Sequence, residues 1–403
     1  MENDRPTVYL DNSNLSIVPE EVVNAMHPYF STSFGHPALV HTPGRNSLKL
    51  IEESRKDISR TINCEADEIT FTSGLTESNN IAIQGIAYAY KEKGNHILIS
   101  KVEPPSVSRV ADVLETEGFK VERVEVNEKG FVKLEHLKER ISDETILISI
   151  SGVADEIGTI EPLKAVNEII EDKNPEIYLH TDFSNGYTKT PIDVQETGID
   201  LLSVGGRKIH SPPGIGFLFV RDGIKLRKIM EGTLTTSTIR PGLETVPLIG
   251  GMRKAVELAF QHTHGNLTTI PKHNEKVRNL RDRLYENILE RIDDILLNGS
   301  EGKKRSPSNL NISFRYVEGE SITLKLSKKG IYVSTGSACA RRSLKPSPVL
   351  KAIGRTAEES HGSIIFELSR YNTVEEIDYV IEVLPEVIAA LRQISALEPE
   401  QSS

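Results

Sequence analysis

The segment 203-SVGGRKIHSPPGIG-216 joins two apolar runs through paired glycines, a basic pair and a Pro-Pro-Gly turn. Glycines let a backbone fold tightly around a ligand, and a lysine held in a partly desolvated place becomes a nucleophilic amine. Lys208 alone is explained equally well by a solvated basic turn, which is the commoner role of a loop lysine. Its meaning therefore depends on the sequence around it.

Short apolar runs alternate with helix-like segments on both sides of this turn, between residues 68 and 221. The runs are EITFTS, HILIS, VERVEV, TILISIS, EIYLHTD, LLSVGG and GFLFV. Such alternation predicts an α/β layer with a mostly parallel sheet flanked by helices. Several runs end in small or chemically active residues, and ligands of open α/β sheets bind outside the carboxyl ends of strands. We therefore expect the site at these ends.

Beyond about residue 256 the sequence pattern changes. A long charged helical stretch is followed by an NISFRYV strand and by a closing amphipathic helix. This pattern predicts a smaller α+β domain that the N-terminal residues join. We expect a large domain over residues 15–255, and a small domain formed by residues 1–14 and 256–403.

Composition excludes several classes of protein. A formal charge of -10 in 403 residues argues against a non-specific nucleic-acid binder. Apolar runs stay below the roughly 18 residues that a membrane span needs, so we expect a cytoplasmic protein with no membrane partner. The two cysteines, Cys64 and Cys339, cannot build a disulfide framework or a zinc site, and we expect reduced thiols. No metal site is predicted with certainty.

Two further strand ends carry chemistry. In 71-FTSGLTESNN-80 a strand runs into Ser-Gly and then a helix, whose N-terminus is suited to phosphate, although an ordinary capped helix explains the same residues. In 180-HTDFSN-185 a buried strand delivers Asp182, which is also typical of a structural turn. A phosphate cradle, an acid about a hundred residues later and then Lys208 together meet the requirements of pyridoxal 5'-phosphate (PLP).

The chain resembles the cysteine desulfurases of the class V aminotransferase family, of the type with a short SGSAC loop. The resemblance rests on YLDNSN, FGHPALVH, FTSGLTESNNIAIQG, DEIGTI, HTDFSNG, RKIHSPPGIG, EGES, 334-STGSACARRS-343, LKPSPVLKAIG and SRYNTVEEID, which span nearly the whole chain. It implies a PLP-dependent homodimer of fold type I. Its substrate would be L-cysteine, its product L-alanine, and its sulfur would pass to Cys339 as a persulfide.

The resemblance also assigns residues to roles. Lys208 would bind the cofactor covalently, Asp182 would pair with its ring nitrogen, and Thr76 would hold its phosphate. The other positions that would contact the cofactor are Leu75, Asp155, Asn185, Gly205 and Arg207. Cys64 has no motif around it and is expected to be structural. Arg341 and Arg342 would lower the pKa of the Cys339 thiol or guide an acidic acceptor, unless they are merely solvated.

Several site positions depart from the family pattern. Pro104 stands where a histidine usually stacks on the cofactor ring, and Asp155 stands where an asparagine usually donates to the cofactor's phenolic oxygen. Leu243 lacks the hydroxyl that normally reaches the neighbouring subunit's phosphate. Most serious, Ile365 replaces the arginine that should bind the substrate carboxylate.

Smaller exchanges accompany these. Gly205 and Arg207 replace a serine and a histidine, and Asn185 replaces a glutamine. An arginine at 207 would bind phosphate bidentately and partly compensate. Arg207, Arg240 or another cation would then bind the substrate carboxylate.

Three functions fit this sequence. We favour a working desulfurase that supplies sulfur to iron-sulfur cluster or thio-cofactor assembly, because a scaffold has no physical need for both Lys208 and Asp182. The second is a desulfurase-like scaffold that binds an iron-sulfur assembly partner, with Cys339 as an iron-sulfur ligand. The third, a PLP lyase or aminotransferase on another amino acid, leaves the Cys339 loop unexplained.

Overall fold

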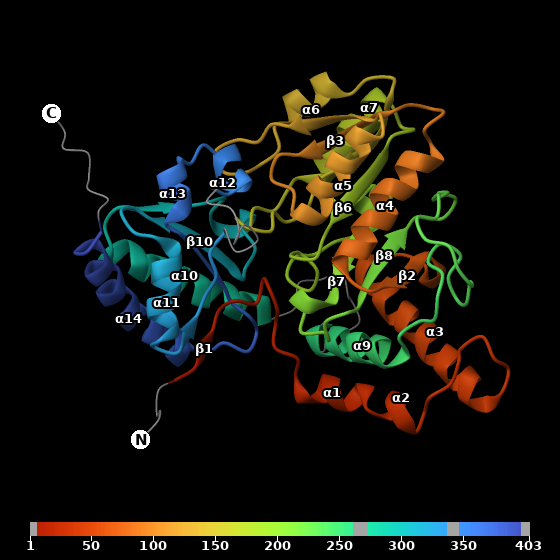
Figure 1. Cartoon of the computed structure of the whole chain (residues 1–403), viewed down its shortest axis with the longest axis horizontal. Coiled ribbons are helices and arrows are strands. Elements are labelled where there is room, and N and C mark those ends of the chain that lie inside the picture. Colours follow the sequence, from red (N-terminus) through yellow and green to blue (C-terminus); the bar gives the residue numbers. More distant parts are fainter. Residues whose placement is uncertain (1–5, 261–272, 337–345, 396–403) are drawn as a thin grey trace.

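The computed structural model describes residues 6–260, 273–336 and 346–395, and its larger part is built on a seven-stranded sheet (Figure 1). Along the sheet the strands run in the order β2-β8-β7-β6-β5-β3-β4. Their bounds are β2 Ile69–Thr72, β3 His96–Ser100, β4 Lys120–Val124, β5 Thr145–Ser149, β6 Tyr178–Asp182, β7 Leu201–Gly205 and β8 Gly216–Val220. β8 is antiparallel to both of its neighbours, and the other pairs are parallel. The predicted mostly parallel sheet is confirmed, and all strands except β8 end at one edge.

Helices cover both faces of this sheet, because successive side chains of a strand point to opposite faces. Leu98 and Ile148 belong to a core shared with α3, α6, α7 and α9, whereas Ile97 and Leu147 belong to a core shared with α4 and α5. Burial on both faces explains why these strands read as continuous apolar runs. The covering helices are α3 Thr42–Ile62, α4 Leu75–Ala89, α5 Pro105–Thr116, α6 Leu134–Arg140, α7 Leu163–Lys173 and α9 Val246–Phe260.

A further core is formed by the C-terminal part of the chain together with the N-terminal residues. Its antiparallel sheet has the order β12-β10-β9, and Val8 and Leu10 pack into the same core. β1 (Val8–Tyr9) pairs in parallel with β11 (Ile331–Tyr332). The remaining elements of this part are β9 Ile295–Leu297, β10 Asn309–Phe314, β12 Ser363–Glu367, α10 His273–Arg291, α11 Gly319–Ser327, α12 Pro348–Ala352, α13 Ala357–His361 and α14 Val374–Arg392. The domain boundaries stay a prediction.

Local signals explain how α14 begins. The Thr373 side chain accepts from Glu376 N, and the Glu376 side chain accepts from Thr373 N, so that both ends of this capping box are satisfied. Shorter helices elsewhere are α1 Glu20–Met26, α2 Pro28–Ser31 and α8 Val194–Thr197. No helix within residues 6–260, 273–336 or 346–395 is long and apolar enough to cross a membrane.

A buried ion pair joins the two parts of the chain. Lys189 follows β6, and its Nζ lies 2.8 Å from Glu367 Oε1 at the end of β12, with both side chains nearly buried. Glu367 also accepts from Ser308 Oγ at 2.6 Å and from Asn309 Nδ2 at 3.1 Å. A buried charge is tolerated only with such partners. The pair therefore fixes β12 against the carboxyl edge of the large sheet.

Two buried carboxyl groups support the same edge. Glu103, after β3, accepts from Ser151 N at 2.7 Å and from Ser151 Oγ at 2.5 Å. Glu161 accepts from Val132 N at 3.0 Å. Burial raises the pKa of each to about 8, although their hydrogen bonds partly oppose this. Both are therefore protonated at neutral pH.

These groups predict that stability falls as pH rises. Each carboxyl binds its proton more tightly in the folded than in the unfolded chain, so stability is fully present below the unfolded pKa and is lost as pH rises toward about 8. We expect the urea midpoint of the wild type to fall between about pH 5 and about pH 8.5. The urea midpoint of Glu103→Gln, which keeps both contacts with Ser151, should fall less steeply over the same pH range. Equal pH dependence of wild type and variant would contradict this.

Candidate active site

Lys208 lies at the carboxyl edge of the sheet, in a 3-10 turn (Gly206–Lys208) that follows β7. Only 2% of the residue is exposed. Its Nζ donates to Asn185 Oδ1 at 3.0 Å and also to Asp155 Oδ1. Asn185 Nδ2 donates to the same Asp155 oxygen. Lys208, Asp155 and Asn185, which were all predicted for the site, thus form one hydrogen-bonded network.

Asp155 is the counter-ion of Lys208. Burial tends to raise the pKa of Asp155, but the Lys208 ammonium and the donated hydrogen bonds hold it below its ordinary value. The carboxylate that replaces an asparagine is therefore anionic, with a cation beside it. Its side chain is 34% exposed, against 2% for Lys208, so a ligand can reach Asp155 more easily than the amine.

Asp182, at the end of β6, is a buried carboxyl group held by neutral donors. Asn79 Nδ2 donates to Oδ2 at 3.0 Å, and Ser184 N donates to Oδ1 at 3.0 Å. Burial raises its pKa, although the charge of Lys208 opposes the shift. Within the part of the chain that the structure describes, no cation contacts this carboxyl group, and the protonated ring nitrogen of a cofactor would supply one.

The N-terminus of α4 faces the same edge. Gly74, with φ at 137°, precedes the helix and provides no side-chain cap, so the first N–H groups are not satisfied within the helix or by this residue. Thr76, predicted as a phosphate ligand, is exposed in this first turn. Glu77 accepts from Arg240 Nε at 3.1 Å, which places a guanidinium beside the helix start.

Leu75 and Gly205 are packed against each other. A Cβ on Gly205 would lie 2.9 Å from Leu75 Cβ, closer than carbon atoms normally approach. The loss of a side chain at 205 therefore gives room to the leucine at 75. The N–H of Gly205 donates to Ser184 Oγ at 2.8 Å, which connects this turn to the Asp182 strand end.

Arg207 has partners that the sequence did not suggest. Its Nη1 donates to the carbonyl oxygens of Ser13, at 3.3 Å, and Asn14. Ser16 N and Ser16 Oγ in turn donate to the Arg207 carbonyl oxygen, at 2.8 and 2.7 Å. The guanidinium thus holds the N-terminal segment across the Lys208 turn. Its role toward a phosphate stays a prediction.

These features fit PLP. The buried amine can bind the aldehyde, the carboxylate of Asp182 can accept a ring N–H, and the open start of α4 can accept phosphate. The fit follows from a helix start that Gly74 does not cap with a side chain, and from the buried Asp182, which no cation contacts among the described residues.

A large cavity adjoins the network. It has a volume of about 540 Å³ and is lined by Pro104, Asp155, Glu156 and Ile365, and by residues on both sides of the segment 337–345. These flanking residues are Ser334, Thr335, Gly336 and Ser347. Cys339, Arg341 and Arg342 lie outside the described residues. Pro104 precedes α5, and Ile365 is 6% exposed on β12. Together with Asp155, three of the departures from the family pattern line this one cavity.

Glu156 connects this cavity with both flanks of that segment. Its Oε2 accepts from Ser347 Oγ at 2.6 Å, and a Cβ on Gly336 would overlap its Oε1. Its carbonyl oxygen accepts from Asn311 Nδ2 at 3.0 Å. Burial raises the pKa of Glu156 to about 8, and the Ser347 hydrogen bond opposes the shift only in part. Sequence reasoning missed this residue, although it directly follows Asp155.

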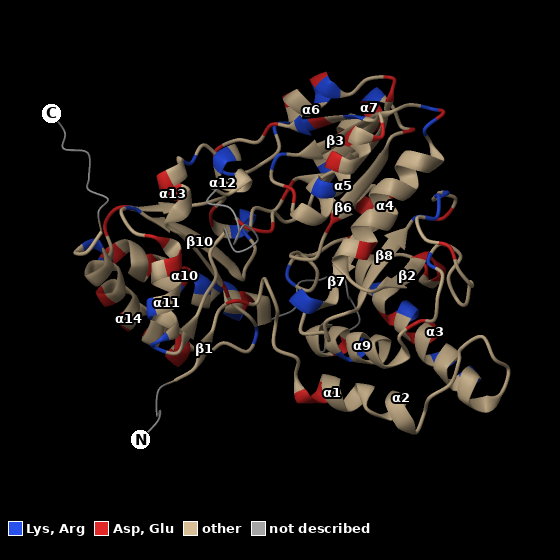
Figure 2. Cartoon of the chain, in the orientation of Figure 1, with Lys and Arg blue, Asp and Glu red and all other residues tan. Residues whose placement is uncertain are grey.

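Two arginines in the cavity wall were also missed. Arg109 on α5 and Arg123 on β4 line the cavity that contains Asp155 and Ile365. Arg123 lies 2.6 Å from Asp112, whereas Arg109 lies 3.5 Å from it and is 81% exposed in its side chain. Figure 2 shows both signs of charge interspersed on α5, a pattern typical of an ordinary surface helix. No sequence signal distinguished these arginines.

Cys64 is the free cysteine within the described residues, and it is half-buried. Burial, and then the charge of Glu68, raises the pKa of its thiol. A thiol with a raised pKa is a poor nucleophile, consistent with the predicted structural role.

Comparisons with known proteins agree with this geometry. The class-V aminotransferase family matches residues 8–380. The chain is 42% identical over 391 residues to cysteine desulfurase IscS of Clostridium botulinum, covering 97% of this chain and 96% of that protein. It is 42% identical over 389 residues to cysteine desulfurase IscS 1 of Archaeoglobus fulgidus, covering 96% and 99%.

Solved structures give the same result. A NifS-like protein superposes with a TM-score of 0.87 at 29% identity, covering 96% of this chain and 100% of that one. SspA in complex with cysteine superposes with a TM-score of 0.78 at 28% identity, covering 91% and 100%. The predicted fold type is confirmed, and the family uses PLP as its cofactor. The chain belongs to the cysteine desulfurase family within the class-V aminotransferases.

Proposed function

We propose that this chain is a PLP-dependent desulfurase that converts L-cysteine to L-alanine and leaves the sulfur on Cys339 as a persulfide. The observation that carries the proposal is the Lys208 network, which adjoins a cavity through Asp155. Residues on both sides of the segment 337–345 line that cavity. The bound cysteine in the similar SspA structure supports the choice of substrate. An iron-sulfur or thio-cofactor assembly partner would then accept the sulfur.

The residues of the site have different roles in this reaction. Bound PLP supplies an electron sink for loss of the Cα proton of the amino acid. Asp182 would hold the ring nitrogen of the cofactor in its protonated form, because a buried carboxylate is stabilised by a cation in contact. Lys208 would bind the aldehyde of the cofactor. Its free amine is held by Asp155 and Asn185 next to the cavity, where its Nζ can hold or give a proton.

The decisive experiment separates a working enzyme from a scaffold. Purified wild type should show a visible absorbance band from lysine-bound cofactor, and Lys208→Ala should abolish it. Added L-cysteine should yield alanine and a mass increase of one sulfur on Cys339. Lys93→Ala is the control, since it removes an exposed lysine that is paired with Glu176 outside this network, and it should leave the band. A bound cofactor without alanine or persulfide would overturn the proposal, and absence of cofactor would favour the scaffold.

We propose that Arg109 meets the substrate carboxylate in place of the arginine that Ile365 replaces. Arg109 lines the cavity and, unlike Arg123, has only a distant carboxylate partner in Asp112. Arg240 is paired with Glu77, and Arg207 holds carbonyl groups of the N-terminal segment. Arg109 is therefore the more available cation.

Arg109→Met should raise the KM for L-cysteine by about tenfold with little change in kcat, because a charge-assisted contact made equally in ground and transition state is lost. Steady-state alanine formation measures this. Arg283→Met, which removes a surface arginine on α10 paired with Asp378, is the control. An unchanged KM for Arg109→Met would exclude the assignment.

We also propose that the chain acts as a homodimer in the cytoplasm. Large apolar side chains are exposed near α1, α2 and the start of α9, including Ile17 at 63%, Phe34 at 65% and Val40 at 86%. Phe34 and the exposed Leu243 line one hollow of about 410 Å³. An apolar surface of this kind favours a protein partner, and a second copy would cover it.

Phe34→Asp should convert the dimer to monomer, because it places a charge in the buried contact. Light scattering should give twice the chain mass of 44.8 kDa for wild type and a single chain mass for the variant. Leu324→Asp, at a position 65% exposed on α11, should stay dimeric. A monomeric wild type, or a dimeric Phe34→Asp, would contradict the proposal.

A further inference from the structure

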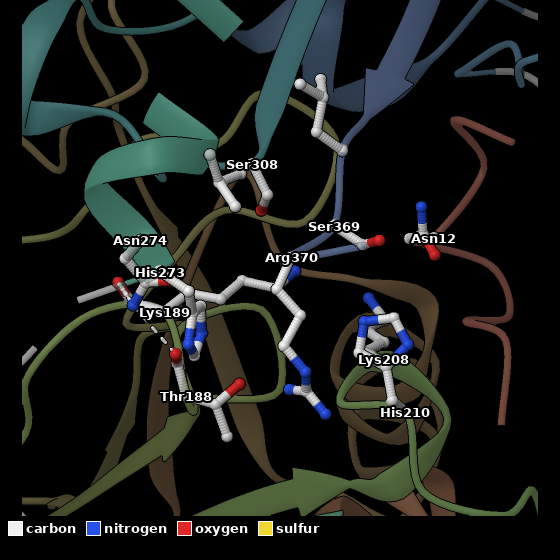
Figure 3. A pocket seen from close by; sticks show the side chains of 12 residues that line it. Asn12, Thr188, Lys189, Lys208, His210, His273, Asn274, Ser308, Ser369 and Arg370 are labelled. Atoms are coloured by element: carbon white, nitrogen blue, oxygen red, sulfur yellow. Dashed lines mark hydrogen bonds between the residues drawn. The ribbon is translucent and has the colours of Figure 1, made fainter. Parts of the chain in front are cut away.

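A small cavity of about 20 Å³ lies where the two parts of the chain meet (Figure 3). It is lined from distant segments: Asn12, Thr188, Lys189, Lys208, His210, His273, Asn274, Val277, Ser308 and Leu368 to Arg370. Basic side chains from both parts of the chain converge on it. Its volume suits a single water molecule or a monatomic ion.

The positive charges around this cavity are unequally compensated. Lys189 is paired with Glu367, and Lys208 with Asp155. Arg370 has no carboxylate within ion-pair distance in the described part of the chain, and its Nη2 is buried without a hydrogen-bond partner. Its guanidinium lies 5.0 Å from the centre of the Tyr371 ring, which provides only a weak interaction. Among the described residues, the charge of Arg370 therefore has no counter-ion.

The surroundings of His210 report the same excess of positive charge. This histidine is 5% exposed, and its Nδ1 lies 2.8 Å from the Ile17 carbonyl oxygen. Burial, and then the charges of Arg370, Lys189 and His273, lower its pKa to about 3, although the contact with the Ile17 carbonyl opposes the shift. The imidazole stays neutral and does not compensate Arg370.

The backbone around the cavity is held in a costly conformation. Thr188 and His210 both line it, and both have positive φ, at 66° and 65°. A β-branched residue is rare in this region, and such strain persists only where surrounding contacts impose it. Here Asn274 Nδ2 donates to the Thr188 carbonyl oxygen at 3.0 Å. Figure 3 shows the Thr188 side chain beside the Arg370 guanidinium.

We propose that this cavity binds one small monovalent anion, of the size of chloride or hydrosulfide, with Arg370 Nη2 and the Thr188 hydroxyl as donors. A single negative charge balances the single uncompensated guanidinium, and a charge-assisted contact satisfies Nη2 better than water does. The anion joins the end of β12 to the segment after β6, next to the Lys208 turn. This site does not depend on the proposed function.

Crystals of the full chain, purified with its cofactor and grown in sodium bromide, test the site directly. The proposal expects an anomalous bromide peak within hydrogen-bond distance of Arg370 Nη2. An ordered water without an anomalous signal, or an empty cavity, would overturn it.

Thermal unfolding tests the same site in solution. At constant ionic strength, replacing sodium gluconate by sodium bromide should raise the Tm of wild type saturably, because an anion that binds only the folded chain stabilises it. Arg370→Met should lose this rise, and Thr188→Val should weaken it. Arg283→Met removes an arginine outside the cavity and should keep the rise.

A bromide-specific rise of equal size in Arg370→Met would contradict the proposal. If that variant does not fold, Thr188→Val and the bromide crystal decide the question. Titrations with sodium chloride and sodium hydrosulfide identify the natural occupant as the anion with the lower half-saturation concentration.

Discussion

Lys208 carries its charge in a place that is 2% exposed, and a buried ammonium requires an anion and further hydrogen-bond acceptors close by. Asp155 supplies the charge and Asn185 the second acceptor. Asp155 lies in the segment after β5 and Asn185 in the segment after β6, so the pairing of β5, β6 and β7 brings both residues to the lysine. The contacts of Lys208 with Asp155 and Asn185 therefore both stabilise the buried amine and connect the segments at this edge of the sheet.

Asp182 differs from Asp155 in the charge of its partners. Its partners Asn79 and Ser184 are neutral, and burial raises its pKa. At this edge Asp155 is thus paired with its cation, whereas no cation contacts Asp182 among the described residues. A cofactor with a protonated ring nitrogen satisfies Asp182, and its aldehyde takes the amine held by Asp155. The two carboxylates differ in role because their environments differ, not because their chemistry does.

The sequence predicted the sheet, its covering helices and the positions of Asp182 and Lys208, because strand ends and apolar runs are local signals. It did not predict the partners of Arg207, whose carbonyl contacts at Ser13 and Asn14 are almost two hundred residues away. Arg109 and Arg370 were missed for the same reason. Each is an ordinary charged residue in its own segment, and only packing against distant segments gives it a cavity to line.

Asp155 and Glu156 are adjacent in sequence but serve different neighbours. Asp155 contacts the lysine, whereas Glu156 accepts from Ser347 and packs on Gly336, on either side of the sequence that contains Cys339. Because the two residues are joined by one peptide bond, the Lys208 network and the flanks of residues 337–345 are held by adjacent positions of one loop. With a pKa raised to about 8 by burial, Glu156 keeps its proton at neutral pH, and no second negative charge weakens the Asp155 contact. The protonated state of one carboxyl group thus preserves the ionised state of its neighbour.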